Sequence, residues 1–81
     1  MSKFIKLSEI HKMSMDNNEN VTMQMGEVYI NVDLVQTITP KTFGNEKYTE
    51  VDMLHNRCNV TETPEEIMAI IRNENRKIRN H

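Results

Sequence analysis

Six side chains of this sequence have the chemistry to hold a flat, charged ligand. Two are aromatic rings that can stack, two are cations that can neutralise an anionic group, and two are amides that can donate and accept hydrogen bonds. We choose them by residue type and by the face they occupy in the sheet predicted below, not by a motif. These candidate ligand-binding residues are Tyr29, Tyr48, Lys12, Arg57, Asn31 and Asn59.

The sequence offers little that catalysis or metal binding requires. The three histidines do not have the spacing of zinc ligands with Cys58. Cys58 alternates with Val60 and is better explained as a small buried hydrophobe than as a nucleophile. With two glycines in all there is no phosphate-cradling loop, and no serine–histidine–acid set is present. We therefore expect no enzyme, no metal and no cofactor.

Two groups of residues leave a structural and a binding role open. A basic cluster near the C-terminus can bind phosphate, although a solvated helix end explains it more simply, because cations are favoured there. That cluster consists of Arg72, Arg76, Lys77 and Arg79. Methionines at alternate positions can be ordinary core or an adaptable contact surface. They are Met13, Met15, Met23 and Met25.

A helix over residues 63–79 is the element around which the rest is arranged. Thr63 can cap it, Pro64 suits its first position, and Glu66 can reach back to complete a capping box. Apolar residues then recur on one side of the helix, which must lie on a surface. They are Ile67, Ile70, Ile71 and Ile78.

The chain before the helix alternates like an antiparallel sheet. We expect a short strand at 3–8, a Met-rich hairpin arm at 11–25 with a polar tip at 16–20, a bulge or break at Gly26, and a polar turn at 31–34. Pro40 is expected to end the strand at 35–39 and to open a loop at 41–45. Strands at 47–54 and 57–62 complete an α+β fold: a small antiparallel sheet of about five strands with one C-terminal helix packed on one face.

Alternation also assigns side chains to the two faces of this sheet. The face toward the helix collects Ile5, Leu7, Val28, Ile30, Val51, Met53, Cys58 and Val60. The other face carries Phe4, Tyr29, Tyr48, Arg57 and Asn59. An uncovered face with aromatic residues is typical of contact with a partner subunit or a ligand.

Size and charge limit the setting. The 81 residues form a single domain (1–81), and so small a core favours stabilisation by a homodimer or homotetramer with the arm in the contact. The net charge of −2 does not favour nucleic acid, and no apolar run is long enough to span a membrane. One cysteine is typical of a reducing cytoplasm.

Three segments, taken together, resemble a known family. Residues 3–8 (KFIKLS), 28–33 (VYINVD) and 60–67 (VTETPEEI) follow the order seen in small FlbD-like proteins, which combine a compact sheet with a short helix. Among phage versions of this plan, the chain is most similar to an anti-CBASS protein. The arm at 11–25 and the helix beyond its first turns depart from the short FlbD-like pattern.

The resemblance implies two alternative functions. The first is a non-enzymatic phage immune-evasion protein, an oligomeric sponge that sequesters a cyclic dinucleotide such as 3′3′-cGAMP in the cytoplasm of the bacterial host. The second is an FlbD-like structural or motility-associated interaction protein.

Overall fold

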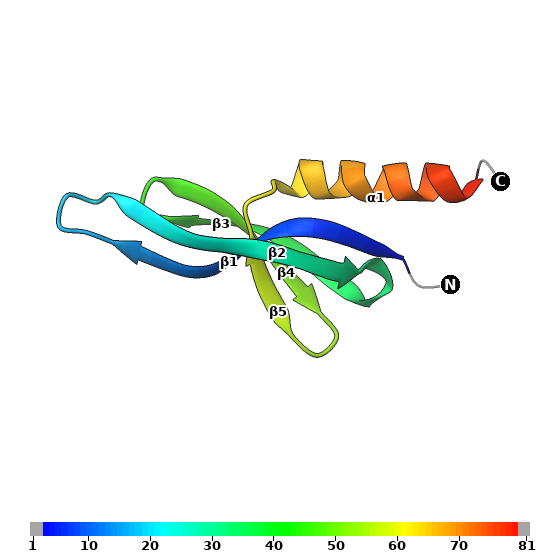
Figure 1. The fold of residues 1–81 in the computed structure, drawn as a ribbon, viewed down its shortest axis with the longest axis horizontal. Helices are drawn as coiled ribbons and strands as arrows, with labels where there is room; N and C mark the ends of the chain where they lie inside the picture. The colour runs from blue at the N-terminus through cyan, green and yellow to red at the C-terminus, as the bar shows by residue number, and fades with distance from the viewer. Residues whose placement is uncertain (1–2, 80–81) are drawn as a thin grey trace.

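The elements follow one another in an order that confirms the predicted α+β fold (Figure 1). The computed structural model describes the backbone of residues 3–79 and the side chains of residues 3–73. Its elements are β1 (Phe4–Met15), β2 (Val21–Asn31), the 3-10 turn η1 (Val32–Leu34), β3 (Val35–Phe43), β4 (Glu46–Met53), β5 (Arg57–Val60) and α1 (Pro64–Arg79). The five strands form one antiparallel sheet in the order β2-β1-β5-β4-β3.

Helix α1 begins with the predicted capping box. The backbone N–H of Glu66 donates to Thr63 Oγ1 (3.1 Å), and the backbone N–H of Thr63 donates to Glu66 Oε1 (2.8 Å). The Ile67 N–H then makes the first helical bond to the Thr63 carbonyl. Two donors at the helix start are thus satisfied by side chains only three residues apart, which fixes where the helix begins.

The core lies between the start of α1 and one face of the sheet, as predicted. Ile67 is 1% exposed and belongs to the same cluster as Ile5, Leu7, Ile30, Val51, Cys58 and Val60. Ile70 and Ile71 are partly buried against this cluster. Ile78 and the basic residues Arg76, Lys77 and Arg79 lie outside the residues whose side chains are described. Figure 1 shows α1 lying along one side of the sheet and running on past it.

The β1–β2 hairpin is one long element, not a short strand followed by a separate arm. β1 runs without interruption from Phe4 to Met15, and the predicted polar tip follows it at 16–20. At this tip the Asp16 carboxylate accepts the backbone N–H groups of Asn18 and Asn20. A short polar side chain bonding its own backbone closes the turn.

The irregularity predicted at Gly26 lies on the opposite strand. Gly26 pairs with Glu9 inside a continuous ladder, whereas the register shifts between Ile10 and Lys12, which makes His11 the extra residue. A Cβ at Gly26 would collide with the His11 imidazole, so glycine here makes room for the bulge. Because one extra residue exchanges the two faces of a strand, the bulge turns Met13 and Met15 away from the side on which Leu7 packs.

β3 continues through Pro40 to Phe43, so the loop expected at 41–45 shrinks to the two-residue turn Gly44–Asn45. Gly44 has φ 59°, the left-handed value that glycine supplies at the first central position of such a hairpin turn. The polar turn predicted at 31–34 is the turn η1, which Asn31 caps by accepting the Asp33 N–H (3.0 Å).

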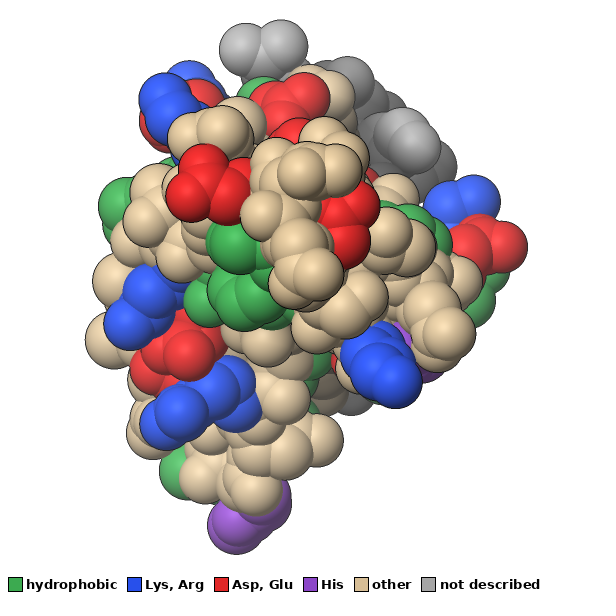
Figure 2. Space-filling view, turned by 90° about the vertical axis from the view of Figure 1, so that its left-hand side faces the viewer, with side chains coloured by type: hydrophobic (Ala, Val, Ile, Leu, Met, Phe, Trp, Pro, Cys, Tyr) green, Lys and Arg blue, Asp and Glu red, His purple; other side chains and the backbone are tan. Residues whose placement is uncertain are grey.

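The ends of the two hairpins touch. A Cβ built on Gly44 would lie 2.5 Å from Met15 Cε and 3.3 Å from Val21 Cγ2, so the β3–β4 turn rests on the last residues of the β1–β2 ladder. Figure 2 views this end of the molecule and shows hydrophobic side chains gathered at its centre with acidic side chains beside them. Met15 is therefore partly a tertiary contact, although it remains 41% exposed.

Strands β1 and β5 join the two halves of the sheet over a short span. Glu9 pairs with Val60, and the Thr61 N–H donates to the Ser8 carbonyl (3.1 Å). The Glu62 carboxylate extends the join by accepting the Ser8 N–H (3.0 Å to each oxygen). The molecule measures 53 × 23 × 19 Å, and none of its described helices is long and apolar enough to cross a membrane.

Candidate ligand site

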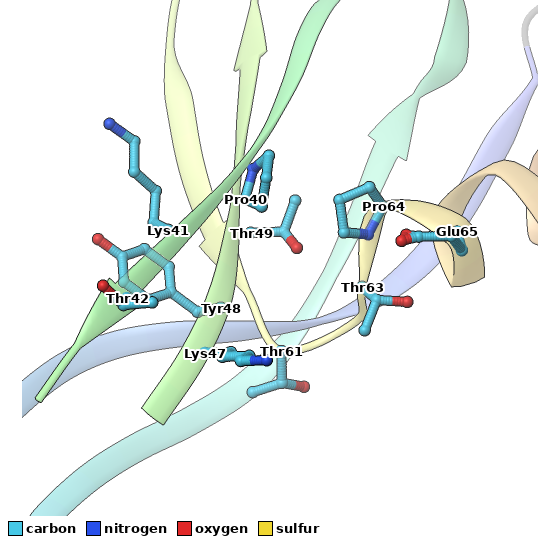
Figure 3. A pocket seen from close by; sticks show the side chains of 10 residues that line it. All are labelled: Pro40, Lys41, Thr42, Lys47, Tyr48, Thr49, Thr61, Thr63, Pro64 and Glu65. Carbon is cyan, nitrogen blue, oxygen red and sulfur yellow. The ribbon is translucent and has the colours of Figure 1, made fainter. Parts of the chain in front are cut away.

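A cavity of about 610 Å³ opens at the β3 edge of the sheet, where the β3–β4 hairpin meets the start of α1 (Figure 3). We call it the edge cavity. Its volume falls within the range typical of small-molecule sites. It is lined by Pro40, Lys41, Thr42, Lys47, Tyr48, Thr49, Thr61, Thr63, Pro64 and Glu65.

Strand register decides how these side chains are presented. Lys41 pairs with Tyr48, so both side chains leave the same face of the hairpin, and Figure 3 shows them together on the far side of the strands from Pro64. Lys47 pairs with Thr42 and leaves the other face, toward the segment that connects β5 to α1. The edge cavity is thus bordered by a lysine on each face of one strand pair.

The connection from β5 to α1 supplies the opposite wall. Thr61 and Thr63 lie on either side of Glu62, whose bond to β1 holds this segment against the sheet. Pro64 faces Pro40 and Thr49 across the space in Figure 3. The capping box therefore fixes part of the cavity wall as well as the helix start.

The lysines of the edge cavity are electrostatically uncompensated at short range. No described carboxylate comes within 4.0 Å of the amino group of Lys41 or Lys47. Lys41 acts only at longer range, where its charge helps to lower the pKa of Asp52. Glu65 is the one acid in the lining, facing two cations. The edge cavity can accept an anion without first breaking an ion pair.

Arg57 lies in a different environment. Its Nε donates to Asp52 Oδ1 at 2.8 Å, and its Nη1 lies 3.8 Å from Glu50. Asp52 also accepts the Thr37 hydroxyl (2.9 Å), and this bond, followed by the one from Arg57, lowers the pKa of Asp52. The hydrogen bond to Asp52, followed by the nearby Glu50 charge, raises the pKa of Arg57. An anion approaching Arg57 meets a cation already held between two carboxylates.

This group borders a second cavity of about 550 Å³, which we call the Arg57 cavity. Its lining consists of Gln36, Thr37, Asp52, Met53, His55, Asn56 and Arg57. Tyr48 and Arg57 were both predicted to lie on the face of the sheet away from the helix. The register pairs Arg57 with Asp52, however, four residues along β4 from Tyr48, which separates them by roughly 13 Å.

The other predicted ligand residues are dispersed. Tyr29 is 66% exposed opposite Lys6, and Lys12 is exposed on β1 next to the bulge. The Asn31 side chain is occupied in capping η1. Asn59 pairs with Glu50, and its Oδ1 is buried without a hydrogen-bond partner in the described part of the chain. Of the six, only Tyr48 lines the edge cavity.

Sequence reasoning missed Lys41 and Lys47 as candidates. It placed Lys41 in a loop, because Pro40 was expected to end the strand. If the strand is continued past Pro40, alternation places Lys41 on the same face as Tyr48, and the observed register pairs these two residues. Pro64, which forms the opposite wall, was recognised as a helix start and nothing more.

Within residues 3–73, Cys58 is buried and belongs to no group of side chains placed to hold a metal ion. Burial, followed by the nearby Glu9 charge, raises the pKa of the Cys58 thiol to about 11, which disfavours the nucleophilic thiolate. Across residues 3–73 there is no group of three His, Cys, Asp or Glu side chains placed to hold a metal ion. His81 lies outside the described residues.

In comparisons with known proteins, no protein-family model, no curated protein and no solved structure matches the chain.

Proposed function

We propose that this protein binds a cyclic dinucleotide such as 3′3′-cGAMP in the edge cavity and holds it without turnover. The observation that carries the proposal is that one cavity is lined by Tyr48 and by two lysines that lack a close carboxylate partner. A cyclic dinucleotide has two phosphates and two aromatic bases, so a site for it needs separated cations and a ring.

Cations close to the cavity must bind the phosphates, because the chain as a whole carries a net charge of −2. Lys41 and Lys47 leave opposite faces of the β3–β4 hairpin, so the two cations border the cavity from two sides. A lysine amino group binds phosphate as a compact point charge. Arg57 is a weaker candidate, because binding there would compete with Asp52 and Glu50.

The uncharged lining suits the rest of such a ligand. The Tyr48 ring can stack on a base, and base–aromatic stacking is worth about 1–3 kcal/mol. Thr42 and Thr61 add exposed hydroxyls that donate and accept. The lining includes no histidine or cysteine.

The FlbD-like order of segments supports the same conclusion, because the phage proteins it resembles are sponges for cyclic nucleotide immune signals. Under this proposal the protein acts in the cytoplasm of a bacterial host and lowers the free concentration of the signal. The alternative, an FlbD-like interaction protein, is favoured by the exposure of Phe4 (55%) and Tyr29 (66%) on the uncovered face.

Calorimetric titration of the full chain with 3′3′-cGAMP and related cyclic dinucleotides tests the proposal. Lys41→Ala and Lys47→Ala should each weaken binding by about 1.5–3 kcal/mol, the value of a hydrogen bond to a charged group. Tyr48→Ala should weaken it by a similar amount. Lys12→Ala is the matched control, since it removes the same charge from β1 outside the edge cavity and should leave affinity unchanged.

Three results would revise this proposal. Ligand recovered chemically altered after heat denaturation would contradict capture without turnover. Affinity lost in Arg57→Ala and kept in both cavity variants would move the site to the Arg57 cavity. No heat with any cyclic dinucleotide would leave the interaction protein as the better explanation.

A further inference from the structure

The two edges of the sheet are protected to very different degrees. An exposed strand edge is a template for pairing with another chain, and proteins block it with bulges, prolines and lysines. β3 has all three: a register shift between Val35 and Thr37, Pro40, and Lys41. Pro40 pairs with Thr49 within a continuous ladder, so its nitrogen, which cannot donate, lies on the outer side.

β2, at the opposite edge, has none of these devices. It runs for 11 residues, contains no proline or lysine, and has Glu27 as its single charged residue. The one bulge of the β1–β2 hairpin is on β1. Glu27 forms an ion pair with β1, its carboxylate lying 3.2 Å from Lys6 Nζ, and its side chain stays 66% exposed.

The ladder shows which backbone groups of β2 face outward. The Val32 N–H donates to the Lys3 carbonyl, and the Asp16 N–H donates to the Asn20 carbonyl. Hydrogen-bonded and non-hydrogen-bonded pairs alternate along an antiparallel ladder. Counting hydrogen-bonded pairs from either end of β2 gives the same result on both sides of the bulge. The even-numbered residues of β2 bond to β1, and the odd-numbered residues from Val21 to Asn31 direct their N–H and C=O groups to the outer edge.

From this we infer that β2 pairs antiparallel with β2 of a second copy of this chain, about a two-fold axis at Gly26. This register pairs all 11 residues of β2, since Val21 then faces Asn31 of the second copy. It joins the outward groups of odd residues to one another, because Met25 faces Glu27 and Met23 faces Tyr29. The sheet continues through both copies.

Two arguments favour this register over its neighbours: an axis at Met25 would leave Ile30 and Asn31 without a partner in β2, and charge disfavours an axis at Glu27. An axis at Glu27 would set two carboxylates directly opposite each other, which is destabilising. The axis at Gly26 places a methionine opposite each glutamate and each tyrosine instead. Thioether–aromatic contacts are favourable, and the pairing would cover Met25 and Tyr29, now 45% and 66% exposed. These side chains leave the face opposite the one that α1 covers, so the helix does not obstruct the contact.

Light scattering and sedimentation of the full chain test the inference. The wild type should have twice the monomer mass of 9.6 kDa at tens of micromolar. Met25→Glu sets a new carboxylate opposite Glu27 of the second copy and should raise the dimer dissociation constant roughly tenfold or more, whereas Met25→Lys sets an ammonium there and should leave it unchanged or lower. Gln36→Glu, on the β3 edge, is the control and should have no effect.

The backbone provides a second measurement. Met25→Pro removes an outward N–H that β1 does not use, so the variant should keep its far-UV circular dichroism and become monomeric. If that variant does not fold, Met25→Glu and Met25→Lys still test whether β2 forms the contact. Amide exchange of the wild type should show Met23, Met25 and Tyr29 protected at high concentration and exposed on dilution.

Several outcomes would overturn the inference. A mass of 9.6 kDa for the wild type at these concentrations would remove the dimer altogether. Equal weakening by Met25→Glu and Met25→Lys would place the axis at residue 25 or the contact elsewhere. A dimer that survives Met25→Pro in folded form, or odd-numbered amides that exchange freely in the dimer, would show that β2 is not the contact.

Discussion

The two faces of the sheet satisfy their side chains in different ways. The covered face buries Leu7, Ile30 and Val51 against the start of α1, and its contacts are apolar. The open face keeps its charges and cancels them internally, with Lys6 bound to Glu27 and Arg57 held by Asp52 and Glu50. The lysines of the edge cavity, Lys41 on the open face and Lys47 on the covered face, follow neither pattern.

This contrast shows why exposure alone is a poor guide to a binding residue. Arg57 on β5 and Lys41 on β3 are both exposed cations on the open face, with β4 between them. One has carboxylates at 2.8 and 3.8 Å, and the other has none within 4.0 Å among the described residues. What separates them is the cost of replacing existing partners with a ligand.

Truncating one side chain on each face of β1 should give the largest difference. Leu7→Ala should lower the free energy of unfolding by about 2–5 kcal/mol, through lost burial and the cavity left behind. Phe4→Ala, on the open face, should lower it by about 0.5 kcal/mol or less, since surface changes usually cost little. Urea denaturation at equal protein concentration measures both. Equal losses would mean that the open face is covered in solution.

The capping box at the border of the covered face should have a smaller effect. Thr63→Ala removes the acceptor for the Glu66 N–H and should cost about 1 kcal/mol. Thr61→Ala is the control two residues earlier, because only the backbone N–H of Thr61 bonds to β1. Thermal and urea unfolding should separate the two variants. A Thr61 variant as unstable as the Thr63 variant would assign the loss to the connecting segment instead of the cap.

Charge cancellation on the open face should produce the smallest effect, a weak dependence of stability on pH. The hydroxyl of Thr37, then the guanidinium of Arg57, lower the pKa of Asp52. Because the pKa of Asp52 is lower in the folded than in the unfolded protein, its ionised carboxylate stabilises the fold. This stabilisation is fully present above the unfolded pKa, near 3.8, and is lost as the pH falls through the folded pKa. Asp52→Asn should therefore flatten the acid side of the stability profile.

An NMR titration of the Asp52 carboxyl carbon measures this pKa directly. Its midpoint should lie below the ordinary aspartate value and should rise in Thr37→Val, which removes the larger cause. A midpoint unmoved by Thr37→Val would show that the Thr37 hydroxyl does not hold the carboxylate in solution.

Local patterns in the sequence were sufficient for much of the fold. The capping box involves residues three apart, so Thr63, Pro64 and Glu66 specify the helix start without reference to the sheet. Alternation was sufficient for the covered face because its strands have one apolar side. Both signals are read within a few neighbouring residues.

The remaining features depend on partners that are distant in the chain. The bulge at His11 cannot be recognised from the hydrophobic pattern. Apolar residues at positions 10, 13 and 15 fit a strand with the extra residue as well as a strand without it. Pro40 ends a central strand but is tolerated on an edge, and only the strand order shows that β3 is one.

The edge cavity was beyond sequence reasoning for the same reason. It combines Lys47 with Thr61 and Pro64, which come together only after β5 has paired and α1 has started. Whether a cation is available to bind a ligand also depends on whether a carboxylate lies beside it, and cross-strand register determines this.

The short join between β1 and β5 has a consequence for how the chain folds. Each other strand pair in the sheet is a hairpin closed by a nearby turn, whereas Glu9 must find Val60 across most of the chain. Local hairpins form in about 1–10 μs, but non-local pairings have to overcome the entropy of a long closed loop first. We expect the hairpins to form early and this closure to limit the folding rate. During synthesis on a ribosome, the β1–β2 hairpin would wait for β5 to emerge before the core could close.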